Sequence, residues 1–192
     1  MKRSLGPRTL AMPAPVWIVG TYDAEDRPNL MTAAWAGICC SKPPAITVSL
    51  RKATHTYQSI LDRQAFTVGI PSVGQAAIAD YIGMVSGREV DKFAAAGLTA
   101  KKAGHVDAPV AEEFPLSLEC RLIHTLEVGL HTMFVGEIVD VQAEEATLGE
   151  SERPSISKLN PLIWAVTESE YYAVGEFVGQ GFSLGKAIRD QE

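Results

Sequence analysis

Alternating apolar and polar positions, with frequent β-branched residues, occur in several short stretches of the chain. In a strand, successive side chains point to opposite faces, so this alternation indicates β-structure with one buried face. Pro, Gly, Asn and Asp separate these stretches and mark turns. The pattern predicts strands at 15–23, 29–40, 45–50, 65–70, 116–129 and 131–145.

Three further segments have helical signals. Residues 56–63 follow a strand directly, and Ser72 with Gln75 three positions later fits a capping box for a helix that stops near Gly83. A shorter helical turn is expected to end at Gly97. We expect a surface loop over 98–115 and irregular structure over 146–163. The Gly-rich tail, 171–185, is expected to pack against the body.

The strands are mostly joined as hairpins, and only short helices lie between them. This order favours a mainly β protein with a closed antiparallel barrel rather than a doubly wound sheet. No repeat, low-complexity tract or linker divides the 192 residues, so we expect a single domain over 1–192.

Charge and composition narrow the choice of partners. The net charge is −6 and no basic run is longer than two residues, which argues against nucleic-acid binding. No apolar stretch approaches the roughly 20 residues of a membrane helix. The N-terminus lacks the apolar core of a signal peptide, and three cysteines are a poor disulfide framework. We therefore expect a cytoplasmic protein without a membrane or nucleic-acid partner.

The cysteines raise one open question. Cys39 and Cys40 are adjacent, and Cys120 stands alone. Thiol redox chemistry is one interpretation of the adjacent pair. Buried cysteine acting as a small apolar residue is the more frequent case. No spacing typical of a structural zinc site is present.

The segment "SLRKATHTY", 49–57, places donors and positive charge between a strand and a helix. Hydroxyls, basic side chains and helix N-terminal amides together can hold a phosphate. The alternative is that Thr54 or Thr56 caps the helix while Arg51 and Lys52 are solvated. No glycine pattern of a P-loop or a Rossmann site is present, so a phosphate site here would be of another kind.

A second segment, "NLMTAAWAG" at 29–37, has small side chains that would let a flat ligand lie against the backbone. Asn29 offers both a donor and an acceptor, as a ring with imide edges requires. The alternative is a barrel strand whose small residues fit a crowded interior. In the same way, His131 and His124 are consistent with hydrogen-bonded strand histidines.

Three motifs together carry a family resemblance: "NLMTAAWAGICCSKPPAITVSLRKATHTYQSI", "YIGMVSGREVDKFAAAGLT" and "GLHTMFVGEIVDV". In this order they closely resemble the flavin reductase-like, FMN-binding split-barrel family, nearest to its flavoredoxin branch. The likeness extends from about residue 8 to 185. It implies a six-stranded antiparallel Greek-key split barrel with added short helices, usually a homodimer, with FMN near the dimer interface.

The resemblance also implies roles for individual residues. The isoalloxazine ring would lie against Asn29, Thr32, Ala33, Ala34 and Trp35. The ribityl chain would follow Ser49, Leu50, Arg51 and Lys52, and the phosphate would be held by Arg51, Lys52, Thr54 and Thr56. Lys92 and Phe93 would close over the site. His131 would lie near the flavin or a nicotinamide, and Tyr172 would reach the partner subunit's site.

Three functions share such a site. The first is an oxidoreductase of the flavin reductase type, in which NAD(P)H reduces bound FMN and the electrons pass to a flavin or protein acceptor. The second is an electron carrier between redox proteins without NAD(P)H activity. The third is a binding module whose flavin is only structural. Hydride transfer to flavin requires no catalytic triad, and none is evident; FMN would supply the redox chemistry.

Overall fold

The computed structural model describes residues 1–189, and β-strands dominate it. The strands are β1 Ala14–Pro15, β2 Trp17–Tyr22, β3 Pro28–Ala33, β4 Ala36–Ser41, β5 Pro44–Arg51, β6 Ala65–Ile70, β7 Ala100–Lys102, β8 Pro109–Ala111, β9 Leu116–Val128, β10 His131–Ala143, β11 Leu162–Ala165 and β12 Glu170–Ala173. The helices are α1 His55–Arg63, α2 Ala76–Met84, α3 Lys92–Ala96, α4 Ile156–Leu159 and α5 Lys186–Arg189, with 3-10 turns η1 Val73–Gln75 and η2 Glu145–Thr147.

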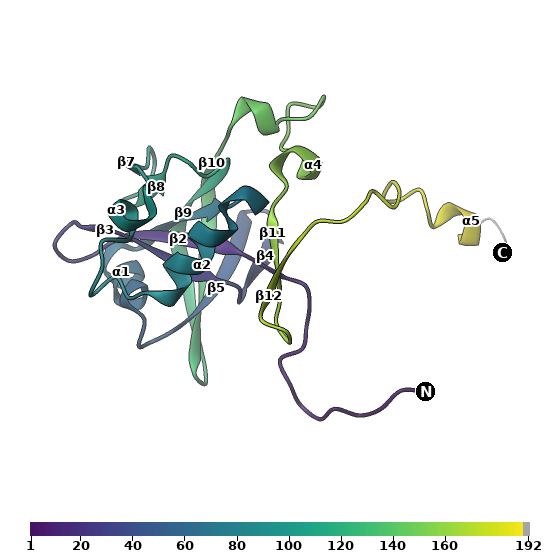
Figure 1. Ribbon diagram of the computed structural model, residues 1–192, viewed down its shortest axis with the longest axis horizontal. Helices are drawn as coiled ribbons and strands as arrows, with labels where there is room; N and C mark the ends of the chain where they lie inside the picture. Colours follow the sequence, from purple (N-terminus) through teal and green to yellow (C-terminus); the bar gives the residue numbers. More distant parts are fainter. Residues whose placement is uncertain (190–192) are drawn as a thin grey trace.

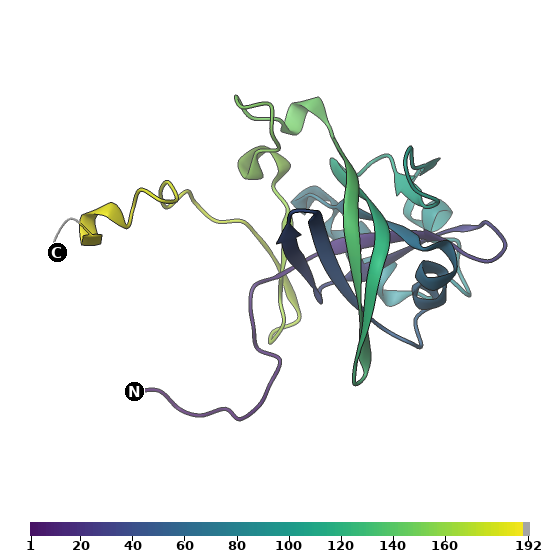
Figure 2. The ribbon, with the colours of Figure 1, turned by 180° about the vertical axis from the view of Figure 1, so that it is seen from behind.

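Seven antiparallel strands form the main sheet in the order β3-β2-β6-β9-β10-β5-β4. Its two outermost strands, β3 and β4, follow each other in the chain with only Ala34 and Trp35 between them. A flat sheet would separate these edges by about 29 Å, whereas three residue steps span at most about 11 Å. The sheet must therefore curl into a barrel that is split between β3 and β4 (Figures 1 and 2).

The expected split barrel is confirmed, and its strand count differs by one. A single strand over 29–40 is wrong, because the chain turns at Ala34 and Trp35 and continues as a second strand. The turn is anchored by the Ser49 backbone N–H, which donates to the Trp35 carbonyl oxygen over 2.8 Å. Small residues lie on both sides of this turn, so the sequence pattern does not distinguish it from a continuous strand.

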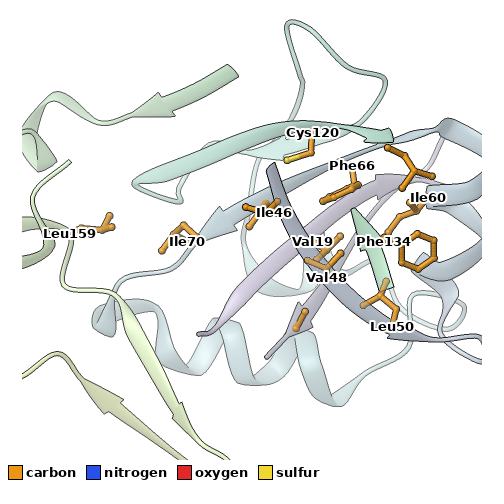
Figure 3. Packing of buried hydrophobic residues seen from close by; sticks show 13 residues of the cluster. Val19, Ile46, Val48, Leu50, Ile60, Phe66, Ile70, Cys120, Phe134 and Leu159 are labelled. Atoms are coloured by element: carbon orange, nitrogen blue, oxygen red, sulfur yellow. The ribbon is translucent and has the colours of Figure 1, made fainter. Parts of the chain in front are cut away.

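The barrel interior is a tightly packed apolar core. Val48, Phe66 and Phe134 are fully buried and lie among Val19 and Ile46 from neighbouring strands (Figure 3). Helix α1 closes one end of this core with Ile60. Because the interior is filled by side chains, a ligand has to bind outside the barrel core, at its split or along its rim.

A second apolar cluster lies under α2 and α3. Leu30 of β3 packs there with Ala79 and Ile82 of α2 and Phe93 of α3. The expected helices are confirmed, and Gly97 ends α3 in a left-handed conformation with φ of 66°. The Ser72 N–H donates to Gln75 Oε1 over 3.0 Å, in agreement with the expected cap. These helices cover the β3 edge of the sheet.

Three sequence expectations fail, in whole or in part, outside the barrel. Residues 98–115 include the short hairpin β7–β8, and 146–163 include α4 and the start of β11. The tail packs against the body only as far as β12, which pairs with β11. Beyond it the chain runs away from the body, with Phe177, Val178 and Phe182 almost fully exposed (Figure 1).

The adjacent cysteines differ from the buried state that was the more frequent interpretation, whereas Cys120 is buried. Cys120 is fully buried, and burial raises the pKa of its thiol to about 12. Cys39 and Cys40 on β4 are both exposed, because β4 is the outermost strand and no element among residues 1–189 covers its outer half. Among residues 1–189, no helix is long and apolar enough to cross a membrane.

Candidate functional site

A groove opens where the barrel is split. Its first part, here called the aromatic cavity, has a volume of about 240 Å³. It is lined by residues of the β3–β4 corner, the end of β5, and the β11–β12 hairpin: Val16, Met31, Thr32, Ala33, Ala34, Trp35, Ser49, Leu50, Arg51, Thr54, Gly83, His131, Trp164 and Tyr171. The corner that closes the barrel therefore also forms the wall of the groove.

Flat rings dominate the aromatic cavity. The Trp35 and His131 rings are parallel within 5°, with centroids 6.1 Å apart. The rings of Trp164 and Tyr171 lie 4.9 Å apart on the β11–β12 hairpin. Trp35 remains 46% exposed, so its ring forms part of the cavity mouth. Flat aromatic walls with few polar groups suit a planar aromatic ligand.

The second part, the cationic cavity, has a volume of about 270 Å³ and shares Met31, Thr32, Thr54 and Gly83 with the first. It is lined by Asn29, Met31, Thr32, Ala53, Thr54, His55, Thr56, Ile82, Gly83, Met84, Val85, Ser86, Gly87, Arg88 and Lys92. This lining includes two basic side chains and several hydroxyls but no carboxylate. The groove is thus aromatic at one end and anion-attracting at the other.

Lys92 supplies a buried charge to the cationic cavity. The residue is only 5% exposed, and its Nζ donates to the Ile82 carbonyl oxygen over 2.8 Å. Burial lowers the pKa of its ammonium group to about 8. No carboxylate pairs with Lys92 in the part of the chain that the structure describes. An anion in the cavity would compensate this charge.

Arg88 is the second basic residue that lines the cationic cavity. Its Nη1 donates to the Ala53 carbonyl oxygen over 3.0 Å, so the segment 85–91 is tied to the turn before α1. The same segment is held close by Gly87, where a Cβ atom would lie 2.0 Å from Asn29 Oδ1 and 2.9 Å from His55 Cδ2. Only glycine fits this approach, and we call 85–91 the strap.

The start of α1 lies below the strap. Thr54 occupies the N-cap position, yet its hydroxyl donates to the Arg51 carbonyl oxygen and does not cap the helix. The capping alternative for Thr54 is therefore wrong. Thr56 is buried and accepts a hydrogen bond from Asn29 Nδ2 over 3.0 Å. The N-terminal end of the helix thus faces the cavity without a side-chain cap, which favours an anion.

Two buried polar atoms beside the cationic cavity have no hydrogen-bond partner. These are Asn29 Oδ1, in a residue only 4% exposed, and His55 Nε2. His55 Nε2 lies 3.6 Å from Asp23 Oδ2, beyond hydrogen-bond length. Buried polar groups are rarely left unpaired, so these two atoms mark a place where a ligand or an ordered water completes the site.

Most of the residues expected from the sequence meet in the groove. Those that line one or both cavities are Asn29, Thr32, Ala33, Ala34, Trp35, Ser49, Leu50, Arg51, Thr54, Thr56, Lys92 and His131. Sequence reasoning gave no site role to Arg88, Ser86, Trp164 or Tyr171. Arg88 lies four positions before Lys92, and this spacing was the signal that could have indicated a site role. The direction of the Arg88 side chain, however, depends on the path of the strap.

Three expected residues lie elsewhere. Lys52 points to the β9–β10 hairpin and pairs with Glu127 over 2.6 Å. Phe93 is buried in the cluster under α2 and α3. Tyr172 is 52% exposed on β12, and its hydroxyl donates to Glu170.

Comparison with known proteins agrees with this geometry. Residues 9–173 match the flavin reductase-like domain. The chain belongs to this family. Flavoredoxin of Desulfovibrio vulgaris (Miyazaki F) is 56% identical with a TM-score of 0.92, covering 96% of this chain and 100% of that one. Flavoredoxin from Methanosarcina acetivorans is 30% identical with a TM-score of 0.89, covering 97% and 100%.

A third solved structure concerns the cofactor. The FMN-binding protein from Thermus thermophilus with bound 1-cyclohex-2-enone is 28% identical with a TM-score of 0.79, covering 94% of this chain and 98% of that one. Membership in the family and this neighbour support a flavin cofactor. The shape and charge of the groove fit a molecule that is planar at one end and anionic at the other.

Proposed function

We propose that this protein is an FMN-binding oxidoreductase of the flavin reductase and flavoredoxin type, formed by a single domain over 1–192. It accepts electrons on bound FMN and passes them to a flavin or protein acceptor. The observation that carries the proposal is the continuous groove, aromatic at one end and cationic at the other. FMN, when bound, supplies the redox chemistry.

The chain's own residues bind and orient the flavin. We assign the isoalloxazine ring to the aromatic cavity, near Trp35 and His131, and the ribityl chain to Ser49, Leu50 and Arg51. Arg51 lines the same cavity as the ring, and a positive charge near the ring edge would stabilise the anionic reduced flavin.

We assign the phosphate to the cationic cavity, with Thr54, Thr56 and Lys92. Arg88 replaces Lys52 and Arg51 in this assignment, because Lys52 is paired with Glu127 outside the groove and Arg51 lines only the aromatic cavity. Two cations without a carboxylate among the lining residues make this end selective for an anion.

The phosphate assignment is tested by comparing FMN with riboflavin, which lacks the phosphate. We expect Arg88→Ala to weaken FMN binding tenfold or more and to leave riboflavin binding nearly unchanged. Lys52→Ala is the matched control, since it also removes an exposed cation but one that lies outside the groove, and should change neither affinity. Arg51→Ala should weaken both ligands. If Arg88→Ala weakens FMN and riboflavin equally, the phosphate does not lie in the cationic cavity.

The electron donor separates two versions of the proposal. In a reductase, NADH or NADPH reduces the bound flavin; in a carrier, another redox protein does so. Similarity to two flavoredoxins favours the carrier, and the family description favours the reductase. Anaerobic stopped-flow mixing of the flavin-loaded protein with each nicotinamide decides between them. Bleaching within milliseconds to seconds indicates a reductase, and no bleaching indicates a carrier that needs a protein donor.

We also propose that the protein is a cytoplasmic homodimer. Both chain ends leave the body, and the C-terminal one carries exposed Phe177, Val178, Phe182 and Leu184 (Figures 1 and 2). Apolar side chains of this size are normally covered, and a second copy would cover them. Tyr172 at the base of this arm would then approach the partner's groove. The free cysteines suit a reducing compartment. Sedimentation velocity at micromolar concentration tests the dimer.

A further inference from the structure

A group of metal-ligating side chains lies outside the groove, where the β7–β8 hairpin lies against strands β9 and β10 (Figure 1). It consists of His105, Glu119 and Asp140, whose ligand atoms all lie within 4.8 Å of one another. His105 belongs to the turn between β7 and β8, Glu119 to β9 and Asp140 to β10. These positions are far apart in the chain, so no ligand spacing in the sequence indicates them.

A β-bulge brings the two carboxylates together. The pairing of β9 with β10 shifts between Ile138 and Asp140, and after the shift Asp140 lies directly opposite Glu119. Without the bulge, Asp140 would point in the same direction as Ile138, which packs against the apolar core. The bulge turns the Asp140 side chain to the face of Glu119. Like charges directly opposite each other on neighbouring strands are destabilising, so this pair calls for a cation.

The Glu119 carboxylate is fully buried and held in one orientation. Its Oε1 accepts hydrogen bonds from the Gly104 N–H over 2.9 Å and from Gln142 Nε2 over 2.8 Å. Its Oε2 accepts from the backbone N–H of His105 over 2.6 Å. Hydrogen bonds of this kind fix a metal-ligating carboxylate in place. The three donors are neutral, so they leave the negative charge of Glu119 uncompensated.

His105 is the only basic side chain near this negative charge. Among residues 1–188, neither Glu119 nor Asp140 forms an ion pair with a lysine or an arginine, and both lie beside His105. A buried charge is costly unless it is paired or coordinates a metal ion. A divalent cation would neutralise both carboxylates at once.

The distances within the group fit the ligands of one metal ion. His105 Nδ1 lies 3.4 Å from Glu119 Oε2 and 3.6 Å from Asp140 Oδ2, beyond the usual length of an N–H···O hydrogen bond. Tetrahedral zinc holds nitrogen and oxygen ligands at about 2.0 to 2.2 Å, which separates neighbouring ligand atoms by about 3.3 to 3.6 Å. The His105 side chain is 59% exposed, so an ion can enter from solvent.

We propose that His105, Glu119 and Asp140 bind a divalent transition-metal ion, for which zinc is the best fit. Imidazole nitrogen with carboxylate oxygens is a ligand set of zinc, whereas Mg²⁺ and Ca²⁺ take oxygen ligands. The Gln142 amide contacts both carboxylates, and a flip of this amide would offer its oxygen as a fourth ligand. The ion would clasp the β7–β8 turn onto the barrel and take no part in the flavin chemistry.

The experiment titrates Zn²⁺ into chelator-treated, FMN-loaded protein by isothermal calorimetry. The exposed thiols Cys39 and Cys40 are competing zinc ligands, so every protein in the series carries Cys39→Ser and Cys40→Ser. We expect one Zn²⁺ per chain and no saturable binding of Mg²⁺ at the same concentrations. No saturable binding of Zn²⁺ would overturn the proposal.

Variants of the ligands identify the site. His105→Ala and Asp140→Asn should each weaken zinc binding by about a hundredfold, the upper end of the loss caused by removing an outer partner of a metal ligand. His124→Ala is the matched control, because it removes another exposed histidine on β9 outside the group, and it should leave the affinity unchanged. Zinc that binds equally well to wild type and to His105→Ala is adventitious, and that result would also overturn the proposal.

Hydrogen exchange provides a readout at the site itself. The N–H groups of Gly104 and His105 both donate to Glu119, so zinc on this carboxylate should slow their exchange by about tenfold. Amides of the β11–β12 hairpin serve as the reference and should not change. Zinc that binds without protecting the turn lies elsewhere on the chain.

The flavin reports separately on the proposed function. None of the three ligands lines either cavity of the groove, so flavin content per chain, measured from the visible absorbance, should be the same in all these variants. A chain that binds zinc at this group but takes up no FMN would contradict the proposed function and leave the metal site intact.

Discussion

At the scale of single residues, Lys92 shows a conflict between stability and binding. Its buried ammonium group has a pKa of about 8, below the usual 10.5, because burial disfavours the charged form. Replacing it by Met should raise the free energy of unfolding of the flavin-free protein by about 1 to 3 kcal/mol at pH 7. The same change should weaken FMN much more than riboflavin. Urea unfolding and ligand titration measure the two effects.

The difference in the free energy of unfolding between wild type and Lys92→Met should depend on pH, and this dependence provides a control. Between pH 8 and 10.5 the unfolded chain keeps the Lys92 proton while the folded chain releases it, so wild-type stability rises with pH in this window. The extra stability of Lys92→Met over wild type should be complete below pH 8 and should disappear by pH 10.5. An advantage that stays constant from pH 7 to 10 would show that the ammonium charge does not cause it.

His131 leads to a prediction about rate. Its ring lines the aromatic cavity parallel to Trp35, at the start of β10. His131→Ala should slow reduction of the bound flavin at least several-fold while FMN affinity changes little, since the phosphate end of the groove is untouched. His124→Ala, an exposed histidine on the neighbouring strand β9, is the control. Equal rates in wild type and His131→Ala would remove His131 from the reaction.

At the scale of elements, the strap 85–91 depends on Gly87. A methyl group there would meet Asn29 Oδ1 at 2.0 Å and His55 at 2.9 Å, so the strap has to move outward. Gly87→Ala should therefore lower FMN affinity tenfold or more and carry Arg88 away from Ala53. Gly104→Ala is the control, because its nearest neighbour would be at an ordinary 3.7 Å. Isothermal titration with FMN measures both; unchanged binding in Gly87→Ala would exclude the strap from the site.

At the scale of the whole molecule, flavin binding links stability to ligand concentration. A ligand that binds only the folded chain stabilises it by about 2.7 kcal/mol at one hundred times its dissociation constant. For a chain of this length, that corresponds to a rise in melting temperature of about 5 to 10 °C. Calorimetry with FMN should show this rise, and the same concentration of riboflavin should give a smaller one. Equal shifts would mean that the cationic cavity contributes nothing to binding.

Much of the barrel followed from local patterns. The strands near 45–50, 65–70, 116–129 and 131–145 were predicted because alternation records which face is buried. The single strand at 29–40 was wrong, since the turn at Trp35 is fixed by a hydrogen bond to Ser49, a residue distant in sequence. The Gly-rich tail was predicted to pack against the body, and it does so only as far as β12, because packing depends on a surface elsewhere in the fold that composition does not describe.

The sequence by itself determined the class of fold, the segment 49–57 with its hydroxyl and basic side chains, and the family to which the chain belongs. Periodicity, turn residues and long motifs are local properties, and each is visible without coordinates. Only the tertiary structure decided which cations face the groove. Lys52 and Arg88 look alike in the sequence, yet one pairs with Glu127 and the other lines the cationic cavity. The reason is physical: the direction of a long, flexible side chain is set by its neighbours in space.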